Sequence, residues 1–505
     1  MKRWWMVVAA CVMALGILAG CGTDKQSQQD GPKHLNMALF WFSETVDPAH
    51  GWDGWTVTRL AAGETLVTVS PDMKMEGQLA DKWENIDPVT WKFHIRQGVK
   101  FQDGTPLTPE AVKASMERVM ELNPRSRKDS KIESITVDGE NLIIKTSEPY
   151  ASFLSSITEP AFVVVNTAAD MSKVETTPVM TGPYRIVAFD KGKEIKLEAF
   201  ADYWGGKPGL DTITVKNVDD NTKRAMALQS GDLDLIHRVD AANRPLFENE
   251  NYNIIDTTGI RLSFMYFNFA GRMADSHLRA AVAAATDYQA LADVTGPGTT
   301  AAGAPFPPTA NLGYDKLDRQ VTNPAKVESE MKAAGYAKNA DGFYAKDGET
   351  LVLKMAVWDN KDTYYEALQA QLNKAGLKTE IVRVQDPSSN PDVSYDFDLL
   401  EKNFLTVSTN DPYWFMVQVF KSDAESNFGG YSNPKVDALL AQMAGTFAID
   451  ERRALTIEIQ KQLLADNACL FLVFPGNTVV TNKKVKNVPN FPIDYYLLTK
   501  DVTLG

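Results

Sequence analysis

The five histidines are where metal chemistry would start, because imidazole is the commonest metal ligand among side chains. They are His34, His50, His94, His237 and His277. No two of them are three or four residues apart, the spacing that would bring two ligands onto one helix face. The sequence therefore predicts no metal site built by the protein alone. An isolated histidine is usually a surface or packing residue, but His50 is also a candidate for contact with a bound ligand.

The short motifs of the common enzyme classes are absent from the sequence. It has no Gly-x-Ser-x-Gly, His-Glu-x-x-His, Cys-x-x-Cys or Walker motif, and no Gly-x-Gly-x-x-Gly. The segment Gly296-Pro297-Gly298 begins like a nucleotide loop, but proline removes an N–H and the next glycine, Gly303, is out of register. These absences favour a protein that is not an enzyme. They leave open catalysis by residues that lie far apart in the sequence.

The first 20 residues have the pattern of a secretory signal, a basic start followed by an uncharged apolar run. The run is shorter than the ~20 residues that a membrane-spanning helix needs, and polar residues follow it at once. It ends in Leu18-Ala19-Gly20-Cys21, which resembles the bacterial lipoprotein signal, where cleavage leaves a lipid-carrying cysteine. We therefore expect a signal peptide over residues 1–20, a lipid on Cys21 and a flexible tether over residues 21–32.

The signal peptide and the lipid on Cys21 then account for two of the three cysteines. Cys11 is removed with the signal, Cys21 carries lipid, and Cys469 remains alone, so no disulfide forms within the mature chain. Cys469 precedes the apolar run Leu470-Phe471-Leu472-Val473-Phe474, which is the opposite of the setting that favours a thiolate. The sequence predicts a buried cysteine in a strand.

The charge balance limits the partners of the protein. Lysine and arginine number 52 and the acidic residues 65, which gives a net charge of −13. Such a chain is not typical of nucleic-acid binders, which are usually basic, and it has no charge-based attraction to anionic lipids. We expect contact with the membrane only through the lipid on Cys21, on the outer face of the cell membrane or in the periplasm. The length of 505 residues suggests about three domains.

Patterns typical of both strands and helices predict a mixed α/β fold that positions the candidate residues. Apolar and polar residues alternate over 91–96 and 194–199, which predicts two half-buried strands, with His94 on the wet face. Thr108 and Pro109 are typical of a helix start, apolar residues follow at helical spacing, and Asn123-Pro124 predicts the end of that helix. Two further apolar stripes predict helices over 436–443 and 455–463.

Several motifs in a fixed order make the strongest pattern in the chain. They are VDPAH at 46–50, GETLV at 63–67, LADKWE at 79–84, WKFHIR at 91–96, VKFQDGTPL at 99–107, TGPY at 181–184, DYWGGKP at 202–208, RAMALQSGDLD at 224–234 and YSNPKVD at 431–437. Together they resemble the family 5 extracellular solute-binding proteins, which deliver peptides, nickel chelates and opine-like compounds to ABC importers. The resemblance covers nearly all of the mature chain.

The resemblance implies a two-lobed α/β fold of the periplasmic-binding-protein type (class II), with a hinge and a ligand cleft between the lobes. In the three-domain arrangement of this family, domain I would comprise 33–51, 180–262 and 485–505, domain II 52–179, and domain III 263–484. Ligand contacts to both lobes would favour the closed form, and the permease with its ATPase would recognise that form. The resemblance implies a monomer, with no cofactor and no nucleic-acid partner.

A peptide ligand is one of two interpretations. Oligopeptide-binding members of the family carry an aspartate that pairs with the peptide's α-amino group, and the matching segment here, residues 407–412, has Ser408 at that place. An unpaired amine in a closed cleft would be costly. Asp411, one turn away, is a possible replacement and keeps the peptide interpretation open.

A nickel chelate is the other interpretation. Nickel-binding members resemble this chain after the domain II helix, where Arg125 and Arg127 match arginines that approach the carboxylates of a chelate. A solvated turn with two surface arginines is the alternative. Another family arginine falls at Glu159, and no histidine follows Trp414, where a metal-contacting histidine can occur. Nickel would therefore have to arrive inside a chelator such as free histidine or a small opine.

Aromatic residues in segments that line the family's cleft are the last candidates. Their flat faces suit a small ligand and tolerate variation in it. They are Trp41, Trp52, Trp55, Tyr413 and Trp414. Core packing is the alternative for each of them alone.

Two other classes of function remain open beside the importer. One is an exported hydrolase, and the other is a lipoprotein adhesin or receptor that has kept the fold without a permease.

Overall fold

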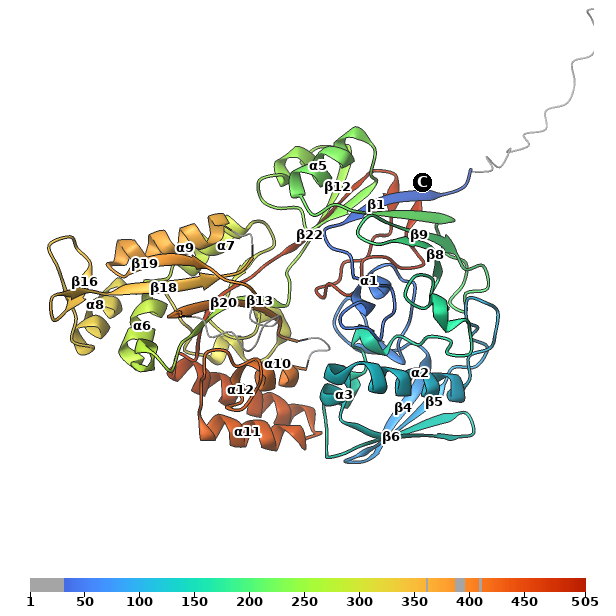
Figure 1. Ribbon diagram of the computed structural model, residues 1–505, viewed down its shortest axis with the longest axis horizontal. Coiled ribbons are helices and arrows are strands. Elements are labelled where there is room, and N and C mark those ends of the chain that lie inside the picture. The colour runs from blue at the N-terminus through green and yellow to red at the C-terminus, as the bar shows by residue number, and fades with distance from the viewer. Residues whose placement is uncertain (1–30, 360–361, 387–395, 408–410) are drawn as a thin grey trace, which may run out of the picture. The chain divides into compact units, whose positions relative to one another are not determined.

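The computed structural model describes residues 31–359, 362–386, 396–407 and 411–505. The chain divides into a unit of residues 1–32 and a unit of residues 33–505. All helices and strands of the described residues belong to the second unit, which is drawn in Figure 1. Among these helices, none combines the length and the apolar composition that a membrane crossing requires.

A seven-stranded sheet has the order β12-β22-β11-β1-β10-β9-β8. Strand β1 is parallel to both of its neighbours, and the other pairs are antiparallel. In β9, Ile195 and Leu197 are buried between more exposed residues, so the strand predicted over 194–199 is confirmed. The strands are β1 (His34–Leu39), β8 (Tyr184–Asp190), β9 (Glu194–Ala199), β10 (Thr212–Asn217), β11 (Leu235–His237), β12 (Tyr252–Thr257) and β22 (Asn477–Asn482). The helices that follow in this part are α1 (Gly54–Arg59), α5 (Asn221–Ser230) and the short η3 (Arg244–Phe247).

A four-stranded antiparallel sheet, in the order β4-β5-β7-β6, carries helices α2 and α3 beside it (Figure 1). In β5, Trp91, Phe93 and Ile95 are buried and His94 is partly exposed, as the alternation predicts. The elements are β2 (Val67–Val69), β3 (Met75–Gly77), β4 (Ala80–Asp87), β5 (Thr90–Ile95), α2 (Pro109–Leu122), α3 (Pro124–Ser130), β6 (Ile132–Asp138), β7 (Asn141–Thr146), α4 (Phe153–Ser156), η1 (Pro160–Phe162) and η2 (Met171–Lys173).

A six-stranded sheet, in the order β14-β21-β13-β20-β18-β19, is the core of the other lobe. Cys469 lies on β21 and is buried, as predicted. The strands are β13 (Arg261–Phe267), β14 (Thr300–Ala301), β18 (Val352–Val357), β19 (Lys378–Arg383), β20 (Leu399–Leu405) and β21 (Cys469–Phe474), with small strands β15 (Ala337–Lys338), β16 (Tyr344–Lys346) and β17 (Glu349–Thr350) at one end. The pair β23 (Val485–Lys486) and β24 (Thr503–Leu504) near the C-terminus packs instead against the core of the seven-stranded sheet.

Seven helices and three short 3₁₀ turns lie in the described part of this second lobe. Val436, Leu440 and Met443 of α11 are buried, and so are Ile459 and Leu463 of α12, so both predicted stripes are confirmed. The elements are η4 (Arg272–Ala274), α6 (Ser276–Ala285), α7 (Tyr288–Thr295), η5 (Pro308–Ala310), η6 (Tyr314–Lys316), α8 (Pro324–Ala333), α9 (Asp362–Ala375), α10 (Tyr413–Phe420), α11 (Pro434–Ala444) and α12 (Ile449–Ala465).

The chain crosses between the seven-stranded and six-stranded sheets at residues 258–260 and 475–476. The two crossings touch, because a Cβ on Gly259 would overlap the carbonyl oxygen of Pro475. A side chain is therefore excluded where the two connections pass each other. This pair of adjacent connections gives the unit the two-lobed fold that was expected.

The division into three domains remains a prediction, and the strand pairing bears on the boundary predicted between residues 484 and 485. Strand β22 was expected in domain III, and it pairs with β11 and β12 of the sheet that β1 belongs to. We therefore prefer a last boundary before residue 477 to one at residue 485.

Candidate functional site

A cavity of about 460 Å³ is lined by residues of both lobes. This volume falls within the roughly 300–1,000 Å³ of typical small-molecule sites. The residues predicted from the sequence that line it are Trp41, Trp52, Trp55, Arg125, Glu159, Asp411 and Trp414. His50, Arg127 and Tyr413 are not among its lining residues, and Ser408 lies outside the described residues.

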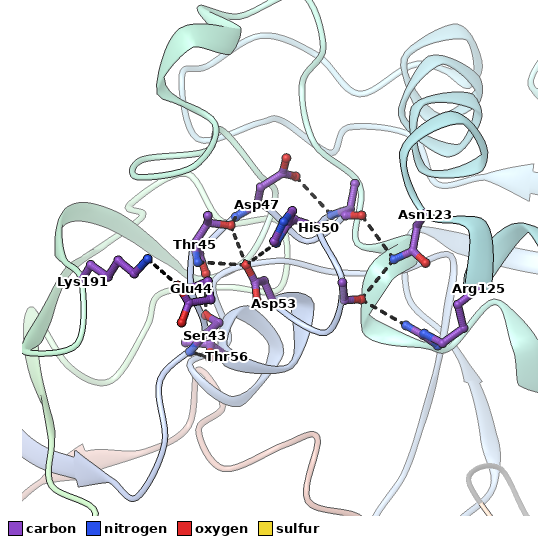
Figure 2. Close-up of polar contacts among 12 residues, drawn as sticks. Ser43, Glu44, Thr45, Asp47, His50, Asp53, Thr56, Asn123, Arg125 and Lys191 are labelled. Carbon is purple, nitrogen blue, oxygen red and sulfur yellow. Dashed lines mark hydrogen bonds and ion pairs between the residues drawn. The ribbon is translucent and has the colours of Figure 1, made fainter. Parts of the chain in front are cut away.

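The loop before α1 is folded around the carboxylate of Asp53 (Figure 2). Its Oδ2 accepts hydrogen bonds from the N–H of Thr45 at 2.9 Å, from the Thr45 hydroxyl at 2.7 Å and from His50 Nδ1 at 3.0 Å. Helix α1 starts next to it at Gly54, where a Cβ would overlap the carbonyl of Pro160. His50 therefore holds the loop that carries the tryptophans, and its ring is not part of the cavity wall.

Two tryptophans of this segment form one wall of the cavity. The rings of Trp52 and Trp55 meet edge to face, with centroids 5.1 Å apart, and Trp55 also contacts the ring of Tyr495 at 5.2 Å. The guanidinium of Arg125 lies 3.6 Å from the centroid of Trp52. A cation over an indole face is attracted by the ring quadrupole, so this contact fixes both side chains.

Arg125 reaches the cavity because a second helix begins directly after α2. The side chain of Asn123 caps α3 by accepting from the N–H of Ser126, and it donates to the carbonyls of Ala49 and Gly51 (Figure 2). Arg125 then donates to the carbonyl of Gly51 at 3.2 Å. The segment expected to end the first helix thus also starts another.

Glu159 is the partner of both Arg125 and Trp55. Its Oε1 accepts from Arg125 Nη2 at 3.1 Å and from Trp55 Nε1 at 3.2 Å, while its Oε2 accepts from the N–H of Ala161. At the position where the family resemblance suggested an arginine, this chain has a carboxylate that is paired with an arginine of its own.

Arg127 points away from this arrangement. Its Nε donates to the carbonyl of Met120 and its Nη2 to that of Glu121, both at the C-terminal end of α2. The last carbonyls of a helix lack partners within the helix, and a cation is favourable there. The structure therefore gives Arg127 a capping position outside the cavity.

Asp411 has its charge satisfied within the protein. Its carboxylate forms an ion pair with Arg452, with Nη2–O distances of 2.9 and 2.8 Å, and its Oδ1 accepts from the N–H of Tyr413 at the start of α10. Arg452 also donates to the hydroxyl of Ser152 at 2.7 Å. Asp411 is therefore a poor replacement for the aspartate that binds a peptide amine.

Asp129 is a cavity residue that sequence reasoning missed. Its Oδ2 accepts from Trp414 Nε1 at 3.0 Å and its Oδ1 from Gln418 Nε2 at 3.4 Å, which joins α3 to α10 across the lobes. Burial raises its pKa, and the neighbouring charge of Glu159 acts in the same direction. Its place at the end of a short helix of mixed polarity gave no signal in the sequence.

A cluster of three arginines around Asp494 was also missed. Arg59 donates from Nε to the backbone carbonyl of Asp494 at 2.8 Å. The carboxylate of Asp494 accepts hydrogen bonds from Nη2 of Arg238 at 2.5 Å and from Nη2 of Arg261 at 3.4 Å. Burial alone would raise the pKa of Asp494, but the charges of Arg261, Arg238 and Arg59 hold it well below its usual range. The four residues come from distant parts of the chain, so no local pattern could reveal them.

The charged groups of the described residues do not form a metal centre. Within residues 31–359, 362–386, 396–407 and 411–505, no group of three or more His, Cys, Asp or Glu side chains is placed to hold a metal ion. The arrangement offers ion pairs, hydrogen-bond donors and aromatic faces, which suit an organic solute.

Two lobes around such a cavity define a binding protein that encloses a small solute. The model of the bacterial extracellular solute-binding proteins, family 5 (Middle), matches residues 74–427, and the chain belongs to this family. The resemblance noted from the sequence motifs is thereby confirmed.

Individual relatives match the chain over most of its length. It is 28% identical to the nickel-binding protein NikA of Staphylococcus aureus over 502 residues, which is 98% of this chain and 99% of the relative. It is 27% identical to the probable D,D-dipeptide-binding periplasmic protein DdpA of Escherichia coli, over 88% of this chain and 89% of that one. The crystal structure of S. aureus NikA with Ni(L-His)2 superposes with a TM-score of 0.80, covering 94% of this chain and 100% of that chain.

Proposed function

We propose that the protein is the substrate-binding component of an ABC importer and performs no catalysis. It works outside the cytoplasm, as a monomer held to the membrane by a lipid on Cys21. Removal of the signal at 1–20 and a tether over 21–32 leave the two lobes free to open and close. Family membership and the sequence around Cys21 support this proposal.

The ligand that the geometry supports best is a compact metal chelate of an amino-acid type chelator. The observation that carries this proposal is the cavity itself, whose charge pairs and aromatic rings suit the organic part of a chelate. Similarity to a nickel-binding relative over nearly the whole chain makes nickel the first metal to test. Nickel is then cargo, held by its chelator, and is not a cofactor.

A short peptide is the second candidate. The carboxylates of Asp129 and Glu159 lie on one wall of the cavity and have one arginine, Arg125, near them. This excess of negative charge would suit a free α-amino group. The pairing of Asp411 with Arg452 weighs against the binding mode that the family's peptide-binding members suggested.

Native mass spectrometry of the protein purified from its own cells separates these candidates. We expect a single added mass with the isotope pattern of nickel and of one or two small chelator molecules, which is lost when a strong chelator is added. A ladder of peptide masses would overturn the chelate proposal in favour of the peptide. Turnover of peptides or esters by the purified protein would instead support an exported hydrolase.

A further inference from the structure

The cluster of arginines in the cavity carries more positive charge than the described residues around it neutralise. Arg59 comes from α1, Arg238 follows β11 and Arg261 begins β13, while Asp494 lies in the C-terminal segment. All four line the cavity. Among the residues that the structure describes, three positive groups therefore share one carboxylate, which leaves an excess of two positive charges there.

Two other charged sites of the cavity wall each combine one cation with one carboxylate. Lys402 is paired with Asp386, and Asp411 with Arg452, so these two sites are balanced. A balanced buried pair still costs desolvation, and a buried charge without a partner costs much more. The arginine cluster is thus the part of the cavity that a ligand of opposite charge would stabilise most.

Arg238 is the member of the cluster best placed to reach a ligand. Its side chain is 36% exposed, against 21% for Arg261 and 3% for Arg59. Its backbone has φ = +53°, a left-handed conformation that is rare for a long side chain and tends to occur at functional sites. The guanidinium also lies 4.4 Å from the ring centroid of Phe40, which restricts its position.

Trp55 stands between this cluster and the acidic wall. Its ring centroid is 5.7 Å from the guanidinium carbon of Arg59 and 5.9 Å from that of Arg261. Its Nε1 donates to Glu159 on the other side. The cavity therefore has a positive and a negative end separated by one indole ring.

We propose that Arg59, Arg238 and Arg261 form a carboxylate subsite, and that the ligand is bipolar. A carboxylate of the ligand lies against these arginines, with Arg238 as its principal donor, since guanidinium groups bind carboxylates with two parallel hydrogen bonds. The amine or metal-bound end of the ligand faces Asp129 and Glu159. Only the assignment of the amine or metal-bound end of the ligand rests on the proposed function. The carboxylate subsite does not, because the excess of positive charge is the same for any ligand.

The test compares two nickel complexes that differ in their carboxylate, one with L-histidine and one with histamine. Calorimetry on the mature protein is expected to give at least tenfold tighter binding for the histidine complex, as one charge-assisted hydrogen bond would provide. Arg238→Gln should reduce this preference to about twofold or less. The matched control is Arg185→Gln, which removes an exposed arginine on β8 that pairs with Glu198 and should leave the preference intact.

A second experiment tests the carboxylate subsite without nickel. Malonate, a dicarboxylate without an amine, should raise the melting temperature of the wild-type protein and of Arg185→Gln more than sodium chloride of equal ionic strength, and should not do so in Arg238→Gln. If malonate acts through Arg238 but neither nickel complex binds, the carboxylate subsite stands and the chelate proposal fails. If Arg238→Gln keeps the histidine preference, or malonate protects it as well as the wild type, the carboxylate subsite is overturned.

Discussion

Asp494→Asn is expected to lower the free energy of unfolding by about 3–5 kcal/mol, the usual effect of breaking a buried ion pair. The substitution keeps the shape of the side chain and removes its charge, so three arginines face one another without a counter-ion. Arg59 is nearly fully buried, and its one acidic partner among the residues that the structure describes is Asp494. Urea unfolding of the ligand-free protein measures the change.

The control for this substitution is Asp202→Asn. Asp202 is 61% exposed and pairs with Lys100 at 2.8 Å, an ion pair of the kind that contributes little. Adding Arg238→Gln to Asp494→Asn should restore part of the lost stability, because it removes one of the repelling charges. Equal urea midpoints for Asp494→Asn and Asp202→Asn would contradict the role given to Asp494.

Glu64→Gln is expected to change how stability depends on pH. Glu64 is buried and accepts hydrogen bonds from the hydroxyl of Tyr203 at 2.7 Å and from Trp204 Nε1 at 3.0 Å. Burial raises its pKa from 4.5 to about 7, against the effect of these hydrogen bonds. Between pH 4.5 and 7 the folded chain therefore holds a proton that the unfolded chain has released, and stability falls as the pH rises.

The size of this effect follows from the pKa. A carboxyl whose pKa moves from 4.5 to about 7 on folding destabilises the protein by about 3 kcal/mol above pH 7. The amide of glutamine still accepts from Tyr203 and Trp204 and has no charge to bury. Glu64→Gln should therefore be more stable than the wild type at pH 8 and about equal at pH 4.

Thermal unfolding at a series of pH values checks this expectation. The matched control is Glu198→Gln on the surface of β9, which should leave the pH dependence as it is. If Glu64→Gln loses stability between pH 4.5 and 7 as steeply as the wild type, another group is responsible for the slope.

Local patterns predicted much of the fold because they reflect local physics. The alternation in β5 and β9 and the capping by Thr108 depend on neighbours in the chain, and the structure has these elements where expected. The pattern Asn123-Pro124 predicted the end of one helix but not the start of the next. The same cap and proline that end one helix are also the preferred start of another, which is α3.

The site was harder to predict because its residues meet only in the folded chain. Arg125 and Arg127 have the same type and setting, but residues two apart on a helix face different ways, so one enters the cavity and the other caps α2. Arg59 and Asp494 are 435 positions apart and their contact leaves no local trace in the sequence. The family resemblance predicted the aromatic residues of the cavity wall and carried no information on this arginine cluster.

A small chelate is expected to bind in the cavity beside Arg125. The most direct test of this binding is a calorimetric titration of nickel with L-histidine into the wild-type protein, Arg125→Ala and Arg127→Ala. We predict one complex per wild-type chain, binding weakened about tenfold or more in Arg125→Ala because Trp52 and Glu159 lose the guanidinium that holds them in the cavity wall, and affinity within about twofold of wild type in Arg127→Ala. No binding to the wild type, or equal affinity in both variants, would contradict this expectation.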